Sequence, residues 1–283
     1  MKTYLVMVAL AFLSCFFATT VKAQVLEGPP RDGVYDKTAI TQVQPIPYPY
    51  LREADIIWTK RIWRTVDLRE KLNQPFYFPE KPQFGWRSLA QIIWDQIKEG
   101  TITAYNPGDD QFSNPMTFKE VKDKVERIDS SLVADTANED RQMWNVAVNE
   151  FSSMDVKKFL VKEDWYFDKQ RSVVEVRILG ICPVIRNMVK GVDMGDKRLF
   201  WIYFPECRNV FAKNEVFNLK NGAAGRMTYD DVFMKRMFSS YVTKEENVYD
   251  RAISEYAMGI ESLLEAEKVK NTLFEFEQNL WEY

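Results

Sequence analysis

The chain has 283 residues, with 38 basic and 41 acidic side chains and a formal net charge of −3 at pH 7. This acidity argues against nucleic-acid binding, which depends on cations that neutralise phosphate. The chain contains no histidine, so every mechanism and every zinc site that requires histidine is excluded.

The first 23 residues have the pattern of a secretory signal peptide. A lysine precedes an apolar run over residues 4–18, and the tripeptide VKA at residues 21–23 resembles a cleavage site. The apolar run of about 15 residues is short for a membrane span, which needs roughly 20. We therefore expect cleavage and export, with an uncleaved anchor or lipid attachment at Cys15 as the alternatives.

Residues 24–50 contain five of the twelve prolines and show neither helical nor strand periodicity. This composition predicts an extended, polyproline-like arm. Ile46, Tyr48 and Tyr50 alternate with prolines and are too apolar for a simple linker. We expect them to bind a partner, the alternative being that the arm packs against its own domain.

Residues 52–64 fit a helix only moderately. Trp58, Arg61 and Trp63 lie within this segment, and we expect them to form the ordered root of the partner contact, since aromatic and arginine side chains are enriched in interface centres. The segment from residue 67 onward begins as a helix and is interrupted by the prolines at positions 75, 79 and 82.

Stronger signals follow. Residues 88–99 are predicted to form a helix that Ser88 caps and Gly100 ends. Residues 101–105 read as a short strand, and a capping box from Thr117 to Glu120 opens a helix to about residue 127. Residues 130–141 are predicted to be a strand end and a polar loop.

The middle of the chain is predicted to be β. Residues 156–168, 172–185 and 198–212 form three β-rich runs, with turns at 169–171 and 191–197. Short connections between consecutive strands favour an antiparallel meander.

The end of the chain is predicted to be helical. Thr228 can cap a helix to about residue 241, and Asn247 can cap a long helix with an apolar face. The predicted class is α+β, with an antiparallel meander flanked by helices, an extended Pro-rich arm and a helical C-terminus. The predicted domains are a signal peptide (1–23), the arm (24–50) and a single α+β domain (51–283).

Cys182 and Cys207 are the only cysteines beyond the signal peptide. They could pair in an oxidising compartment. We expect two buried free thiols instead, and the absence of a C-x-x-C spacing excludes that redox motif.

Three groups of carboxylates could in principle carry chemistry. We expect them to be turn or surface residues, since the chain is rich in acids, and we predict no catalytic, cofactor-binding or metal-binding residues. The groups are Asp109 with Asp110, Glu163 with Asp164 and Asp168, and Asp193 with Asp196.

Long segments of the chain resemble a known family. Residues 58–82, 163–181, 199–212 and 235–251 look like the gliding-motility protein N family, GldN/PorN, and the resemblance covers most of the chain from about Asp32 to Tyr283. It implies an exported, non-enzymatic part of the type IX secretion system. Implied partners are the outer-membrane lipoprotein GldK/PorK, the periplasmic part of the motor protein GldM/PorM, and copies of the same chain in a ring.

The expected function is therefore that of a structural subunit in the periplasm, held near the outer membrane by its lipoprotein partner, without a membrane span of its own. The alternative is a periplasmic hydrolase acting on polysaccharide. That activity would need two carboxylates about 5–10 Å apart in a cleft.

Overall fold

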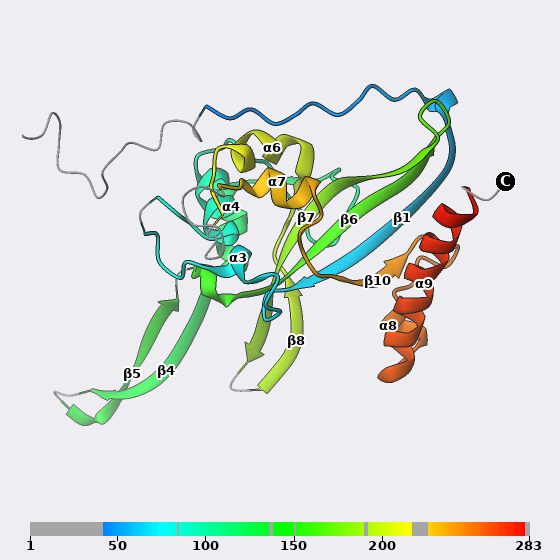
Figure 1. Cartoon of the computed structure of the whole chain (residues 1–283). Coiled ribbons are helices and arrows are strands. Elements are labelled where there is room, and N and C mark those ends of the chain that lie inside the picture. The colour runs from blue at the N-terminus through cyan, green and yellow to red at the C-terminus, as the bar shows by residue number, and fades with distance from the viewer. Residues whose placement is uncertain are drawn as a thin grey trace, which may run out of the picture. The chain divides into compact units, whose positions relative to one another are not determined.

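An antiparallel sheet of eight strands organises the protein (Figure 1). The computed structural model describes residues 42–83, 85–135, 138–149, 151–189, 192–216 and 226–280, which belong to one compact unit, Lys37–Tyr283. The predicted signal peptide and residues 24–41 of the predicted arm lie outside the described residues. The strands follow the order β10-β1-β6-β7-β9-β2-β3, and β8 pairs with β7. They are β1 Ile56–Asp67, β2 Ala104–Tyr105, β3 Pro115–Met116, β6 Val156–Asp168, β7 Val173–Val189, β8 Val192–Arg198, β9 Trp201–Tyr203 and β10 Tyr241–Glu245.

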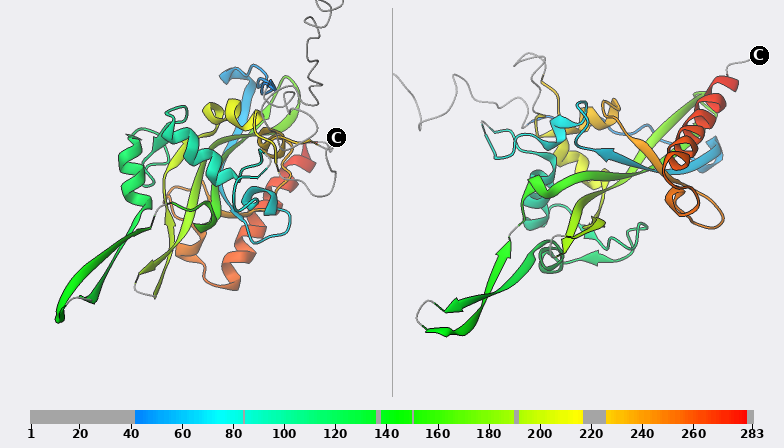
Figure 2. Two further views of the ribbon diagram at one scale, coloured as in Figure 1. Left: turned by 90° about the vertical axis from the view of Figure 1, so that its left-hand side faces the viewer. Right: turned by 90° about the horizontal axis from the view of Figure 1, so that it is seen from below.

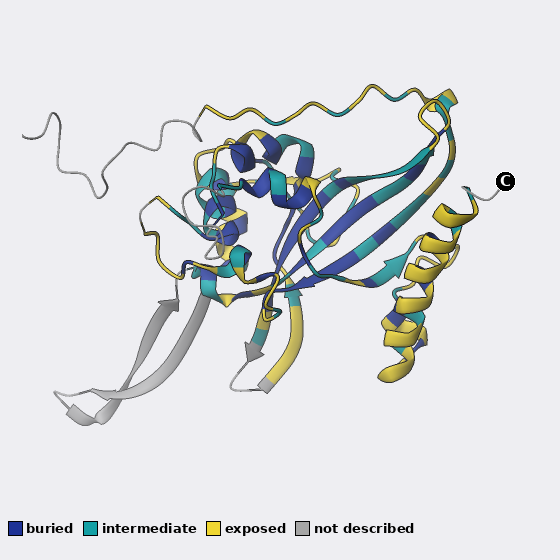
Figure 3. Cartoon of the chain, viewed as in Figure 1, coloured by how far each residue is buried: buried dark blue, intermediate teal, exposed yellow. Residues whose placement is uncertain are grey.

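Five helices contribute to the main hydrophobic core with this sheet: α3 Gln74–Tyr77, α4 Leu89–Lys98, α5 Phe118–Val125, α6 Phe204–Ala212 and α7 Tyr229–Met234. Their aromatic side chains meet at the centre of the core, where Phe233 contacts the rings of Phe76, Phe204 and Phe211. The buried residues of these helices face the sheet (Figure 3). The predicted α+β class is confirmed.

A smaller core joins the sheet to the C-terminal helices α8 Ile253–Tyr256 and α9 Ile260–Asn279. Ala266, Val269 and Leu273 of α9 pack with Ile62 of β1 and Val242 of β10. Burial of these side chains holds α9 beside the edge strand β10.

Strands β4 Arg127–Asp135 and β5 Asn138–Asn149 form a two-stranded sheet separate from the main one (Figure 2). A strand end and a polar loop are predicted for residues 130–141. The strand end is present in β4, whereas the loop prediction is wrong because β5 begins at Asn138. Residues 138–142 are all polar or charged, a composition that resembles a loop.

The caps of α4 and α5 were predicted correctly. Ser88 accepts a hydrogen bond from the backbone of Gln91 at the start of α4, and Gly100 follows its end with a φ of 76°, a conformation that glycine adopts without strain. Thr117 and Glu120 form the predicted capping box of α5. The predicted strand at residues 156–168 has the observed bounds of β6.

A helix was predicted over residues 52–64, whereas Glu53–Asp55 form a single 3-10 turn and Ile56–Asp67 form the strand β1. Lys60 and Arg64 occupy the same face of β1 as Ile62 and Val66, so cations interrupt the apolar alternation that marks a strand. Both cations are neutralised by cross-sheet carboxylates, Glu245 for Lys60 and Glu163 for Arg64.

The third predicted strand, residues 198–212, is mostly helical. Only Trp201–Tyr203 is a strand, and α6 begins at Phe204 with Pro205 in its first turn. Proline is favoured there because its missing N–H would have no intrahelical partner. The predicted turn at 191–197 is also wrong, since Val192–Arg198 forms β8 against β7.

The C-terminal helices are shorter than predicted. The helix capped by Thr228 ends at Met234, and Tyr241 opens β10 instead. Asn247 caps no helix. Its side chain bonds to the backbone of Glu245 and Arg251 and closes a turn, so the predicted long helix begins only at Ile260.

Candidate functional site

The six residues predicted to bind partners lie on the arm and on β1. Side chains alternate between the two faces of a strand, so Trp58 points to one face of the sheet and Arg61 and Trp63 point to the other. The structure therefore brings Arg61 and Trp63 together and separates Trp58 from them. Their role in partner binding stays a prediction.

Trp58 is directed towards the smaller core. Its ring stacks on Phe276 of α9 with centroids 4.3 Å apart and planes inclined by 25°. Together with Trp165 it packs against the buried residues of the C-terminal helices. Trp58 thus contributes to folding by anchoring α9.

Arg61 and Trp63 are both fixed by carboxylates. Arg61 donates from Nε and Nη2 to the two carboxylate oxygens of Asp164, at 2.6 and 3.0 Å. The indole Nε1 of Trp63 donates to Asp110 at 2.8 Å, and the ammonium groups of Lys244 and Lys162 lie 4.5 and 5.6 Å from its ring centroid. A tryptophan between two cations has a favourable cation–π environment.

The loop at residues 106–114 is pinned over this face of the sheet. Phe112 has a φ of 60° and rests on Gly180, where an added Cβ would approach its ring to 2.5 Å. Lys162 donates to the backbone carbonyl of Asp110 at 2.6 Å. Gly180 is therefore needed for the close approach of the loop, which carries Asp110 to Trp63.

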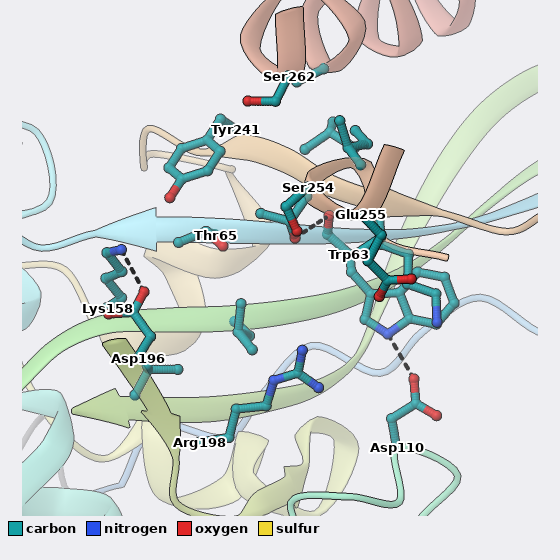
Figure 4. A pocket seen from close by; sticks show the side chains of 18 of the residues that line it. Trp63, Thr65, Asp110, Lys158, Asp196, Arg198, Tyr241, Ser254, Glu255 and Ser262 are labelled. Atoms are coloured by element: carbon teal, nitrogen blue, oxygen red, sulfur yellow. Dashed lines mark hydrogen bonds and ion pairs between the residues drawn. The ribbon is translucent and has the colours of Figure 1, made fainter. Parts of the chain in front are cut away.

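A pocket of about 520 Å³ lies between this loop, the sheet, β10 and the C-terminal helices (Figure 4). Lys158 is paired with Asp196 at 2.7 Å in its wall, whereas Arg198 has no ion pair among the described residues. The lining mixes cations, carboxylates, hydroxyl groups and apolar side chains. Its floor comes from four strands: Trp63 and Thr65, Lys158 and Leu160, Val184, and Arg198.

Tyr48 holds the arm to the body of the protein. Its ring centroid lies 4.3 Å from the guanidinium carbon of Arg208 and 4.9 Å from that of Arg177. The same arginines donate to arm carbonyls, Arg208 to Ile46 at 2.7 Å and Arg177 to Pro49 at 2.8 Å. Burial raises the pKa of the Tyr48 hydroxyl. We call this set, Tyr48 with Arg177 and Arg208, the arm clamp.

Arg208 is prepared for this contact by Asp230. Its Nε and Nη2 donate to the two carboxylate oxygens at 2.9 and 3.1 Å, and both residues are buried. A bidentate pair of this kind fixes the plane of the guanidinium group. Helices α6 and α7 therefore fix the Arg208 side of the arm clamp, whereas Arg177 comes from β7.

Ile46 and Tyr50 point away from the clamp, with exposed fractions of 77% and 88%. A strand would have turned both residues to the side of Tyr48, whereas three residues per turn spread them. The arm therefore has one side chain directed to its own domain and two directed outward.

A buried ion cluster lies on the face of the sheet to which Trp58 points. Glu163 is fully buried and accepts contacts from Arg64 at 3.1 Å and Arg236 at 3.0 Å, while both guanidinium groups lie 5.5 Å from the ring of Trp165. Burial lowers the pKa of Arg64. The cluster links β1, β6 and the turn after α7.

The candidate carboxylates are engaged by their neighbours. Ion pairs hold Asp110, Glu163, Asp164, Asp168, Asp193 and Asp196. Hydrogen bonds from the backbone of Gln111 keep the pKa of Asp109 low, and Arg171 does the same for Asp168. A general acid needs a raised pKa, so these two groups are poorly suited to that role.

Two features are absent from the described part of the chain. No group of three or more cysteine, aspartate and glutamate side chains there is placed to hold a metal ion. Within the same ranges, no helix is both long and apolar enough to cross a membrane. Cys182 and Cys207 are buried free thiols, as predicted.

Sequence reasoning missed Arg177 and Arg208. Arg208 lies in an apolar segment whose one other charge is Glu206, and a cation in such a segment indicates a buried ion pair. Nothing in the local sequence points to Tyr48 as its second contact, because the two residues meet only in the folded chain.

Comparison with protein families gives one match. The model of a family described as gliding motility associated protein GldN matches residues 51–282. The match covers all described elements from β1 to α9 and begins directly after the predicted arm, residues 24–50. Comparison with curated protein sequences gave no match.

Proposed function

The chain belongs to the GldN family, a component of the gliding and type IX secretion machinery, and from this premise we propose that it is a non-enzymatic structural subunit of that machinery. The observation that carries the proposal is the family match, which spans the sheet and the helices on both sides of it. A subunit of this kind acts through its surfaces and needs no reaction centre.

The chemistry of the chain supports a structural role. It has no histidine, and the candidate carboxylates are held by cations or by backbone N–H groups. The alternative, a carboxylate-based hydrolase, would need one carboxylic acid with a raised pKa beside a second, free carboxylate. No observation on the described residues favours that arrangement.

The proposed partners are the outer-membrane lipoprotein GldK/PorK, the periplasmic part of the motor protein GldM/PorM, and further copies of the chain in a periplasmic ring. The resemblance of the sequence to GldN/PorN suggests these partners, and the apolar run at residues 4–18 supports export. In this proposal the lipoprotein attaches the subunit to the outer membrane.

Co-assembly tests the proposal. Residues 24–283 are purified alone and together with the lipoprotein partner, and both samples are run on size-exclusion chromatography and inspected by electron microscopy. We expect co-elution as one large species containing rings. A monomer that elutes at the same volume with and without the lipoprotein would contradict the proposal.

A second experiment addresses the non-enzymatic role in cells. Asp164→Asn combined with Asp168→Asn removes two candidate carboxylates, and we expect type IX secretion to continue. Circular dichroism and ring assembly serve as controls for folding. Loss of secretion from a folded, assembled variant would indicate chemistry at these residues.

A further inference from the structure

The C-terminal part of the protein exposes many large apolar side chains. Nine of the nineteen that are exposed in the described ranges lie between Tyr241 and Phe274. Four of them are on α9, with exposed fractions of 76% for Ile260, 61% for Leu263, 64% for Leu264 and 58% for Phe274. Large apolar side chains that gather on one exposed segment are typical of a site of interaction.

Helix α9 carries apolar side chains on two sides. Ala266, Val269 and Leu273 are buried against the sheet, while Ile260 and Leu264 near its start and Phe274 near its end lie on a side that faces solvent, with the Glu267–Lys270 ion pair between them. A helix on the surface of a folded protein usually has one apolar side only, and a helix that is apolar all round is usually buried. The second side therefore lacks the element that would cover it.

The same segment carries the negative charge of the protein. Residues 241–279 contain four basic and nine acidic side chains, a net charge of −5 (4 − 9). The whole chain has −3, so the remainder is positive by two charges (−3 + 5). The acidity is local to the surface that exposes the apolar side chains.

Five of these carboxylates have no cation within ion-pair distance among the described residues: Glu246, which accepts a hydrogen bond from the backbone N–H of Arg61, and Glu255, Glu261, Glu275 and Glu277. The two lysines of α9 are already engaged, Lys268 with Glu265 and Lys270 with Glu267. The uncovered apolar side of α9 is thus bordered by carboxylates whose charge is not compensated.

We propose that this surface, residues 241–279, docks a basic amphipathic helix of a partner protein. Its apolar residues would cover Ile260, Leu264 and Phe274, and its lysine or arginine side chains would pair with the free carboxylates. At a rise of about 1.5 Å per residue, the stretch from Ile260 to Phe274 matches a partner helix of roughly four turns. The inference rests on the proposed function, because it describes the chemical nature of one contact within the proposed assembly.

Charge argues against the other occupants. A second copy would bring two sets of uncompensated carboxylates together, which is unfavourable. Residues 24–41 of the same chain contain three acidic and two basic side chains and so offer no positive charge. Anionic lipid would be repelled by the same carboxylates.

The test uses residues 24–283 and two synthetic amphipathic helical peptides with the same leucine face. One peptide has lysine on its polar face and the other has glutamate. Leu264→Ser with Phe274→Ser alters the proposed surface, and Ile57→Ser with Met194→Ser is the matched control, because Ile57 and Met194 are each 65% exposed elsewhere.

We expect the lysine peptide to bind, with a dissociation constant at least tenfold higher for the Leu264/Phe274 variant and unchanged for the control. Binding should weaken as salt is added, because exposed charges are screened. The glutamate peptide should not bind.

Several outcomes would overturn the proposal. Equal binding of the lysine peptide to both variants would mean adsorption by charge alone, and failure of that peptide to bind the unaltered protein would exclude the surface. A dimer in sedimentation that Leu264→Ser with Phe274→Ser dissociates would identify a second copy as the occupant. Binding to phosphatidylglycerol vesicles that this variant loses would identify lipid. None of these results decides whether the protein co-elutes with the lipoprotein, which tests the proposed function separately.

Discussion

Trp58 of the first strand stacks on Phe276 of the last helix, with ring centroids 4.3 Å apart. The contact ties α9 to β1 beyond the point where β10 ends its pairing with that strand. An aromatic pair contributes about 0.5–1.5 kcal/mol in addition to the burial of its area. The stack is therefore a principal anchor of α9.

We predict that Phe276→Ala weakens the docking of α9 by about 1–2 kcal/mol, less than the loss for a fully buried phenylalanine. Hydrogen exchange should accelerate in residues 260–279 and remain unchanged in β6 and β7. Phe274→Ala is the control, since Phe274 is 58% exposed. Similar acceleration in both variants would show that the stack does not anchor the helix.

Glu163 and Asp164 are neighbours on β6 that face opposite sides of the sheet. Glu163→Gln would leave Arg64 buried without a carboxylate, and we expect a loss of about 3–5 kcal/mol in the free energy of unfolding. Asp164→Asn breaks an ion pair that is partly exposed to water, which should cost less than about 1 kcal/mol. Urea unfolding of both variants measures the difference, and equal losses would contradict a structural role for the buried cluster.

Ionisation of Tyr166 makes the stability of the folded protein depend on pH in the alkaline range. Burial of its hydroxyl and the hydrogen bond to Glu175 raise its pKa to about 12. The unfolded value is about 10, so the folded state holds this proton more tightly. The resulting stability is complete below pH of about 10 and is lost as the pH rises towards about 12.

We predict that Tyr166→Phe makes the decline of stability above pH of about 10 shallower. Urea midpoints of the two proteins across this range provide the measurement, and lysine titration is common to both. Tyrosinate absorbance of the folded protein should show one fewer late-titrating group in the variant. Parallel curves for the two proteins would rule out Tyr166 as the cause.

The two cysteines should be unreactive in the folded protein. Both thiols are buried and unpaired, and burial raises the pKa of Cys182 to about 12 and also raises that of Cys207. The thiolate is the reactive form, so we expect no labelling by iodoacetamide until the protein unfolds. The intact mass should equal that of the reduced chain, and a mass lower by two hydrogens would demonstrate a disulfide.

Much of the fold was accessible from local patterns. The capping residues Ser88, Thr117 and Thr228 located three helix starts, and the alternation around Val174 located part of β7. These signals are reliable because their cause lies within a few residues. The class followed from several such segments together, whereas the family came from the resemblance of longer segments.

The remaining errors involve partners distant in sequence. β1 was taken for a helix because Lys60 and Arg64 lie on the face of the strand that packs inward, and their neutralisation by Glu245 and Glu163 depends on strand pairing. Residues 204–212 resembled a strand because α6 is buried and apolar. Short apolar runs do not distinguish a buried helix from a buried strand.

The candidate site was predictable only as composition. Aromatic and arginine residues near the arm were identified, but the face of the sheet to which each points was not. Trp58 and Trp63 belong to the same strand, β1, and point to opposite faces. The arm clamp joins Tyr48 to Arg177 and Arg208 and required the folded chain to be recognised.

We predict that Tyr48 holds the arm to the body of the protein and that Tyr50 does not. Tyr48→Ser removes two cation–π contacts, each worth about 0.5–1 kcal/mol, and should free residues 42–50 from the body of the protein. Tyr50→Ser changes a side chain that is 88% exposed and should leave the arm in place. Limited proteolysis within residues 42–52 should therefore be about three- to tenfold faster for Tyr48→Ser only, because cleavage follows the population of the open form.

The same pair of variants tests the role of the arm in assembly. We expect Tyr50→Ser, alone or with Ile46→Ser, to weaken co-elution with the lipoprotein partner while circular dichroism and proteolysis stay unchanged, because these outward side chains are available for contact. Deletion of residues 24–44 should preserve folding, since the clamp lies beyond the deleted segment. If Tyr50→Ser and the deletion both assemble as the unaltered protein does, the arm serves only its own domain, and Tyr48 is its one functional side chain.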